Sequence, residues 1–132
     1  MKNAKAFAPS GISSFFEICD REVNGTPIRD LAKIGARGGG FGFEKGVLTE
    51  VSVESADIIS IEVFINGSLA PEALTTRKVV KDLLKNYEAP CKVLVKHEVA
   101  VPIGAGFGTS AAGALTAALA LNEALGLNLT YN

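Results

Sequence analysis

The chain has 132 residues, of which 48% are hydrophobic and 20% charged, and its formal net charge is −1. This length and composition suit one folded domain and exclude a disordered chain. Because positive and negative charges balance, no broad electrostatic field favours nucleic acid or an acidic membrane, and we expect neither as a partner.

The amino-terminal third of the chain is predicted to be mostly extended. The apolar run 4–7 is typical of a strand that stops at the turn-forming residues 8–11, and a second β-like segment follows at 15–18. Six glycines between residues 31 and 46 weaken regular structure. That segment is predicted to be either a loop or a strand with bulges.

The middle of the chain contains two strand patterns and a helix pattern. Apolar and polar residues alternate over 47–54 and over 59–65, which indicates two strands, and we expect them to form an antiparallel pair. Pro71 then stands at the start of a segment with apolar residues at helical spacing. An amphipathic helix is therefore predicted over 71–87.

A last strand and a last helix complete the predicted order. The strand spans 93–101 and carries His97 on its valine-rich face, which favours a buried core histidine over a catalytic base. The helix runs from Thr109 to Leu125, with Gly126 as the residue that ends it. It is apolar all round, so we expect it to be buried. Together these elements predict an α+β or α/β fold with helices on one side of the sheet.

The segment between this strand and this helix is typical of an anion-binding loop. Gly104, Gly106 and Gly108 let the backbone approach a ligand closely, and the free amides of the next helix would point at its negative charge. A Walker loop is excluded because no lysine precedes Thr109, and a Rossmann loop because the glycines occupy alternate positions. Phosphate is the expected ligand, and a merely tight strand-to-helix turn is the alternative.

This loop resembles the second motif of the GHMP kinases, the family of galactokinase, homoserine kinase, mevalonate kinase and phosphomevalonate kinase. The family pattern Pro-x-Gly-x-Gly-Leu-Gly-Ser-Ser-Ala is matched at Pro102, Gly104, Gly106, Gly108, Ser110 and Ala111. Phe107 and Thr109 replace the usual Leu and Ser and keep their apolar and hydroxyl character. The resemblance implies the α+β fold of the family's amino-terminal domain. This is a two-layer βαβ fold like that of a ribosomal protein, with helices packed on one side of a mixed or antiparallel sheet.

The resemblance also implies ATP and Mg²⁺ as cofactors. Backbone amides from Gly104 to Ser110 would hold the α- and β-phosphates, and the Ser110 hydroxyl would help to hold the metal ion. The implied ATP-binding residues are Pro102, Gly104, Ala105, Gly106, Phe107, Gly108, Thr109, Ser110 and Ala111.

Two further segments resemble archaeal-type pantoate kinases. Residues 6–16 are similar to their first motif, with Ala-Pro, a short polar turn and a Phe-Phe pair, and residues 35–41 to their Gly-x-Arg-Gly stretch. This implies an ATP-dependent kinase that phosphorylates pantoate for coenzyme A biosynthesis, with homoserine or mevalonate as alternative acceptors. Arg37 is the candidate ligand of the substrate carboxylate, and a structural or surface arginine is the alternative. Asp20 and Asp30 are weaker candidates, for which capping or solvated roles are favoured.

The resemblance covers residues 1–132 as the amino-terminal, ATP-binding part of a kinase domain. It implies that the catalytic aspartate, an acidic metal ligand and a third glycine-rich motif belong to a carboxy-terminal half that this sequence lacks. A fragment, a kinase encoded as two chains and a decayed remnant are the alternatives, and a non-catalytic nucleotide-binding or assembly subunit is the rival function. Because a half domain leaves apolar surface uncovered, we expect a homo-oligomer or a complementary second chain.

The two cysteines and the lack of targeting signals favour a cytoplasmic protein. Cys19 and Cys91 match neither a metal-binding pair nor a small disulfide framework, so both are predicted to be reduced and buried. No signal-peptide pattern is visible, and the most apolar run, 111–121, is too short to span a bilayer.

Overall fold

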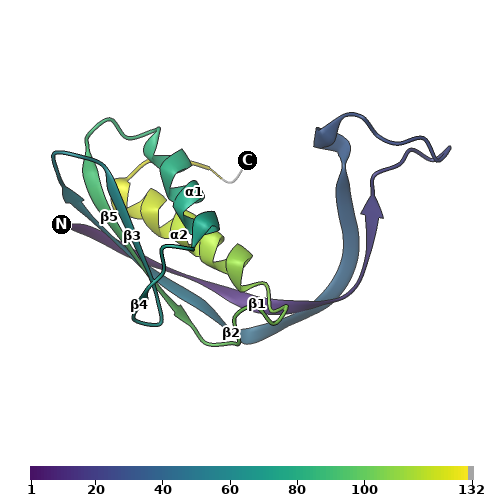
Figure 1. The fold of residues 1–132 in the computed structure, drawn as a ribbon, viewed down its shortest axis with the longest axis horizontal. Coiled ribbons are helices and arrows are strands. Elements are labelled where there is room, and N and C mark those ends of the chain that lie inside the picture. The colour runs from purple at the N-terminus through teal and green to yellow at the C-terminus, as the bar shows by residue number, and fades with distance from the viewer. Residues whose placement is uncertain (131–132) are drawn as a thin grey trace.

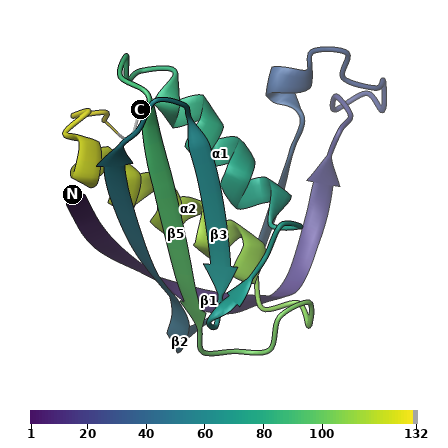
Figure 2. The same ribbon diagram turned by 60° about the vertical axis from the view of Figure 1, so that its left-hand side comes forward.

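The structure is a computed structural model and describes residues 1–130. Two helices cover one face of a five-stranded sheet (Figures 1 and 2). The elements in chain order are β1 (Lys2–Cys19), a 3-10 helix (Leu31–Lys33), β2 (Gly35–Ser55), β3 (Ser60–Ile65), β4 (Ser68–Leu69), α1 (Leu74–Leu84), β5 (Cys91–Val99) and α2 (Thr109–Leu125). The predicted α+β fold class is confirmed.

The sheet is mixed, with the strand order β1-β2-β5-β3-β4. β2 pairs antiparallel with β1 and with β5, whereas β3 pairs parallel with β5. The predicted pairing of the strands at 47–54 and 59–65 is therefore wrong, because β5 lies between them. Val93 and Val95 of β5 are fully buried, and β5 is flanked by the neighbouring strands β2 and β3 on its two sides. The helix α1 supplies the crossover that parallel neighbours require.

The strands β1 and β2 extend beyond the helices as a long two-stranded arm, residues 11–42, which rises away from the rest of the molecule in Figure 1. β1 is continuous through residues 8–11, so the predicted pair of strands around a tight loop is wrong. Pro9 pairs with Gly46 and Gly11 pairs with Gly42, which leaves a bulge opposite Ser10. The arm thus bends at this bulge without interrupting either strand.

The glycine-rich segment 35–46 belongs to β2, which confirms a bulged strand as the correct one of the two predicted alternatives. A Cβ atom at Gly38, Gly40 or Gly46 would collide with a carbonyl oxygen of β1. The register of the two strands also shifts twice along the arm. The glycines are required because the strands approach each other so closely there.

The core lies between the helices and the sheet. Its fully buried members include Val51, Val63, Val80 and Leu121, which come from β2, β3, α1 and α2. Each element contributes one apolar face, so the helices are held by burial of apolar surface.

The boundaries of α2, β3 and β5 are close to those predicted. α2 has the predicted bounds and ends at Gly126, whose φ of 66° is left-handed. α1 is shorter than predicted at both ends, because Pro71 and Glu72 form a turn before the helix and residues 85–86 form a turn after it. The side of α2 that faces away from the sheet leaves Leu115 50% exposed, so the predicted burial of the whole helix is wrong for that side.

Both cysteines are free, as predicted. Cys91 is buried in the core, but Cys19 is only half-buried at the end of β1 on the arm, so its predicted burial is wrong. Within residues 1–130, neither helix is long and apolar enough to cross a membrane.

Candidate functional site

The loop between β5 and α2 has a backbone path that requires its alternating glycines. Gly104, Gly106 and Gly108 have φ values of 74°, 83° and 68°, all left-handed. This region costs other residues about 1–2 kcal/mol each, because the Cβ atom crowds the following carbonyl oxygen. Gly108 is the N-cap of α2 and adopts this conformation as the helix begins.

The first turn of α2 leaves its backbone amides free. Gly108 provides no capping side chain, and no acidic residue lies in the first turn. The amide of Ala112 donates to the Gly108 carbonyl over 3.0 Å, whereas the amides of Thr109, Ser110 and Ala111 have no partner within residues 1–130. Free amides at the positive end of a helix dipole form a binding site for an anion.

The loop is held against the base of the arm. The amide of Gly11 donates to the carbonyl of Phe107 over 3.2 Å. The ring of Phe107 also packs against that of Phe43 at a centroid distance of 5.6 Å. At the same bend, the buried Ser10 hydroxyl donates to the Lys45 carbonyl over 2.6 Å. The segments singled out in the sequence at 6–16, 35–46 and 102–111 therefore meet at one point.

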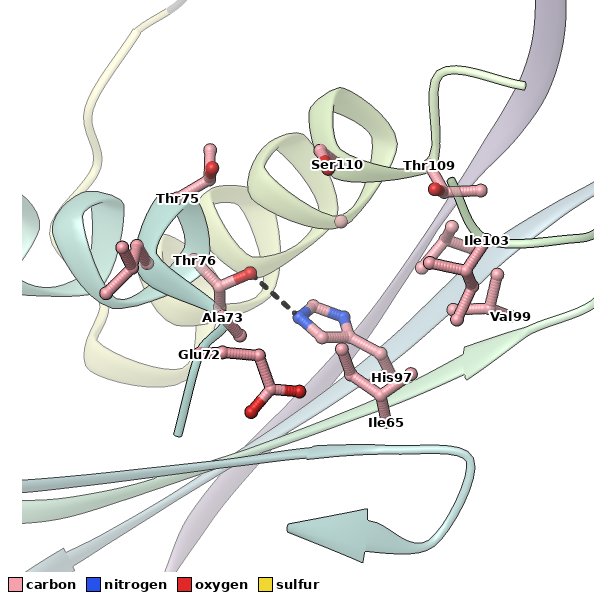
Figure 3. A pocket seen from close by; sticks show the side chains of 13 residues that line it. Ile65, Glu72, Ala73, Thr75, Thr76, His97, Val99, Ile103, Thr109 and Ser110 are labelled. Carbon is pink, nitrogen blue, oxygen red and sulfur yellow. Dashed lines mark hydrogen bonds between the residues drawn. The ribbon is translucent and has the colours of Figure 1, made fainter. Parts of the chain in front are cut away.

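A cavity of about 320 Å³ opens beside this point (Figure 3). That volume is at the lower end of the range for small-molecule sites. Its apolar walls come from Val47, Ile65, Val99 and Ile103, and its polar groups from Glu72, Thr75, Thr76, His97, Thr109 and Ser110. Figure 3 shows Ser110 and Thr109 on α2 at one side and Thr76 and Glu72 at the other. The sequence analysis missed Glu72, Thr75 and Thr76, because no motif marks them.

His97 lies at the floor of the cavity and is 3% exposed. Its Nδ1 atom lies 2.7 Å from the Thr49 hydroxyl and its Nε2 atom 3.1 Å from the Thr76 hydroxyl. Burial lowers the pKa of His97, because removal from water disfavours the charged ring. The prediction of a satisfied core histidine is confirmed.

The structure brings Arg37 together with residues of the arm and separates it from the cavity. Its Nε atom forms an ion pair with Glu17 at 2.8 Å, and its side chain is 76% exposed. This pair raises the pKa of Arg37, chiefly through the hydrogen bond. Arg37 lines a second, open cavity with Phe15 and Phe16. Its role as a carboxylate ligand stays a prediction.

The two aspartates have the more ordinary roles that the sequence favours. The Asp30 carboxylate caps the short 3-10 helix by accepting from the Ala32 amide over 3.1 Å. Asp20 is exposed and lies 4.0 Å from the Arg21 guanidinium. Neither lines the cavity beside the glycine loop.

Both the sequence and the structure of the chain resemble those of known proteins. The model of the GHMP kinases N terminal domain matches residues 74–132. A structure titled as a phosphotransferase related to the CoA biosynthesis pathway matches with a TM-score of 0.79 and 32% identity, over 94% of this chain and 40% of that one. Over residues 74–132, the chain therefore matches the amino-terminal domain of the GHMP kinase family. The predicted family and its amino-terminal domain are thus confirmed.

More distant GHMP-fold structures match at the level of fold. A homoserine kinase from Cytophaga hutchinsonii has a TM-score of 0.65 and 17% identity, over 98% of this chain and 38% of that one. A mevalonate diphosphate decarboxylase from Staphylococcus aureus has a TM-score of 0.66 and 19% identity, with the same coverage. The chain therefore spans 40% or less of the length of these structures. No curated protein matches the chain.

Proposed function

We propose that this chain binds MgATP at the glycine loop and serves a kinase that phosphorylates a small hydroxy acid. The observation that carries the proposal is the loop itself. Three left-handed glycines lead into a helix whose first three amides are free, at the edge of a cavity of about 320 Å³. An anion site next to a cavity of that size suits a nucleotide.

In this proposal the phosphates lie on the loop and the nucleoside lies in the cavity. The amides of Thr109, Ser110 and Ala111 bind phosphate oxygens, with the helix dipole adding to the attraction. Ile65 and Val99 offer an apolar surface for the base. Carboxylate and hydroxyl groups on the α1 side of the cavity provide hydrogen-bond partners for the sugar.

The residues of this chain suit Mg²⁺ only in part. The Ser110 hydroxyl lines the cavity at the start of α2, where it can bind a metal ion held by the phosphates. Within residues 1–130, no group of three or more His, Cys, Asp and Glu side chains could hold a metal. Ser110 would thus share the ion with phosphate oxygens, water and an acidic ligand from outside this part of the chain. Bound MgATP supplies the transferable phosphoryl group and neutralises its charge.

Phosphoryl transfer needs positioning and charge stabilisation more than covalent chemistry from the protein. The described residues contribute the phosphate-binding amides and the walls that orient the nucleotide. The acceptor hydroxyl has to meet the phosphate from the open side of the loop. Arg37 is proposed to bind the acceptor carboxylate, which requires that carboxylate to replace Glu17 at the guanidinium.

Pantoate is the proposed acceptor, with coenzyme A biosynthesis as the process served. It is supported by the 32% identity to a phosphotransferase whose title names the CoA biosynthesis pathway. The Ala-Pro…Phe-Phe and Gly-x-Arg-Gly segments support the same acceptor. A homoserine- or mevalonate-type kinase is the second candidate, favoured by the similarity to a homoserine kinase. A non-catalytic nucleotide-binding subunit is the rival, which the same loop and cavity would also suit.

Phosphorus NMR tests the proposed reaction. The chain is incubated with MgATP and either pantoate, homoserine or mevalonate, alone and with extract fractions that co-purify with it. A new phosphomonoester signal with pantoate alone among the acceptors is expected. A signal with another acceptor would reassign the substrate. Intact ATP in every sample, despite nucleotide binding, would favour the non-catalytic subunit.

A further inference from the structure

Four buried polar side chains form a hydrogen-bond network beneath the cavity. Thr49 belongs to β2, His97 to β5, Thr76 to α1 and Thr116 to α2. All four are at most 5% exposed. Their hydrogen bonds therefore join two strands and both helices in a region from which water is excluded.

The direction of each hydrogen bond follows from counting protons. The Thr116 hydroxyl donates its proton to the Ala112 carbonyl over 2.8 Å. The Thr49 hydroxyl, 2.5 Å from Thr116, must then donate to it and can only accept from His97. His97 therefore carries its proton on Nδ1, and its Nε2 atom accepts from the Thr76 hydroxyl. The bond between Thr76 and His97 is the single link from α1 to the rest of the network.

The imidazole ring also supports α2 directly. A Cβ atom on Gly113 would lie 3.5 Å from Cε1 of His97, so the helix rests almost on the ring. Gly113 is one turn after Ser110, and both residues line the cavity. The ring thus lies under the part of α2 whose amides face the proposed phosphate site.

We infer that His97 is a positioning residue for the nucleotide: through Nε2 it holds the start of α1 at a fixed distance from the start of α2. The inference rests on the proposed function. The cavity is bounded by residues 72–76 on one side and by Thr109, Ser110 and Gly113 on the other. Because Thr76 and the ring close the floor between them, loss of their bond lets the two sides move apart. The other bonds of the network hold α2 to the sheet and do not reach α1.

Substitution of His97 by Asn or Gln separates the role of its Nδ1 atom from that of its Nε2 atom. In His97→Asn, the amide nitrogen takes the place of Nδ1 and still donates to Thr49, but nothing accepts from Thr76. In His97→Gln, the longer side chain brings its amide oxygen to the position of Nε2 and still accepts from Thr76. Thr76→Val removes the same bond from the α1 side, and Thr49→Val is the matched control on the sheet side.

The test is titration of each folded full-length variant with MgATP by calorimetry, at a temperature well below its unfolding transition. Thr76→Val and His97→Asn are expected to raise the Kd about five-fold, the effect of one lost hydrogen bond. Thr49→Val is expected to stay within about two-fold of the unchanged protein, and His97→Gln is expected to recover most of the affinity that His97→Asn loses, although both variants lose stability. Equal Kd values for Thr76→Val and Thr49→Val would overturn the inference.

Amide hydrogen exchange of the free chain provides a readout that needs no nucleotide. Thr76→Val is expected to speed exchange in the first turns of both α1 and α2, and Thr49→Val in α2 alone. Faster exchange confined to α1 in Thr76→Val would contradict the coupling even if MgATP binds. If the unchanged protein does not bind MgATP while both helices respond, the proposed function fails and the coupling between the helices stands.

Discussion

At the residue scale, two left-handed glycines, one inside and one outside the loop, allow the effect of backbone strain to be distinguished from an effect on ligand binding. Gly106 and Gly25 have the same φ of 83°, and a Cβ atom on either would meet nothing within 4 Å. Gly106→Ala and Gly25→Ala should therefore each lower the free energy of unfolding by about 1–2 kcal/mol. Only Gly106→Ala should also weaken MgATP binding, by at least about ten-fold, because it redirects the amides of the loop.

Denaturant unfolding and calorimetric titration of the two variants check this prediction. Gly25 lies in the arm, away from the glycine loop, so its variant reports strain alone. Equal losses of affinity in both variants would mean that strain spreads through the molecule. Unchanged affinity in Gly106→Ala would remove the loop from the binding site.

His97 makes the stability of the chain depend on pH. Its pKa in the folded state lies below the ordinary value of 6.5, because burial disfavours the charged ring. Between these two pKa values the unfolded chain binds more protons than the folded one, so the free energy of unfolding falls as the pH falls. The histidine's contribution is complete above about pH 6.5 and decreases below it.

The urea midpoint, followed by circular dichroism between pH 7.5 and pH 5, measures this effect. We expect the midpoint to fall with pH in the unchanged protein and to change less in His97→Gln, which has no titrating ring. A midpoint with the same pH dependence in both would show that carboxylates, and not His97, control it. Other titrating groups are common to the two proteins and cancel in the comparison.

At the scale of elements, Gly113 lies in the interior of α2, where glycine weakens a helix, and it also lines the cavity. A Cβ atom on Gly113 would make an ordinary contact of 3.5 Å with the ring of His97. Gly113→Ala should stabilise the chain by up to about 1 kcal/mol, because alanine favours the helix interior. The added methyl group also enters the cavity, so MgATP binding should weaken.

Thermal unfolding and titration of Gly113→Ala check both parts of this prediction. A lower melting temperature would mean that the ring and the helix have no room for the methyl group. A higher melting temperature with unchanged affinity would mean that the nucleotide does not reach the floor of the cavity.

The elements also show which features a sequence pattern can predict. The bounds of α2 were predicted because its start follows a glycine loop and its end meets Gly126, and both signals are local. The partners of β3 were not predicted, because alternation marks an apolar face without naming the neighbouring strand. The glycines of 35–46 left two alternatives open, since close approach of β1 is a contact between distant segments.

The candidate site likewise contains residues that a local motif marks and residues that only the fold brings together. The loop residues 102–111 form one continuous motif, so the sequence alone singles them out as candidates. Glu72 and Thr76 line the same cavity only because the β3–α1–β5 crossover brings the start of α1 next to α2. Their residue types and spacing carry no signal for this, so the fold was needed to find them.

At the scale of the whole molecule, the arm presents apolar side chains to solvent. Phe15, Phe16 and Phe41 are each 68–70% exposed, and Leu115 on α2 is 50% exposed. Burial of such a surface favours association. We propose that the chain forms a homo-oligomer or binds a complementary second chain.

Light scattering over a wide range of chain concentrations, with Phe15→Ser and Phe41→Ser as variants, tests this proposal. The mass should rise with concentration in the unchanged chain and less so in both variants. A second chain that co-purifies with the unchanged chain, but not with the variants, would favour the heteromeric alternative. A monomer at every concentration, with no accompanying chain, would contradict the proposal.

The central claim is that the glycine loop and its neighbouring cavity bind MgATP. Titration of the nitrogen-15-labelled chain with MgATP, followed by amide chemical shifts, tests it most directly. We expect saturable shifts at Gly104 to Ala111 and at Val99 and Ile103, with little change in the part of the arm that follows residue 20. Saturable shifts confined to other parts of the chain, or no shifts at millimolar MgATP, would contradict it.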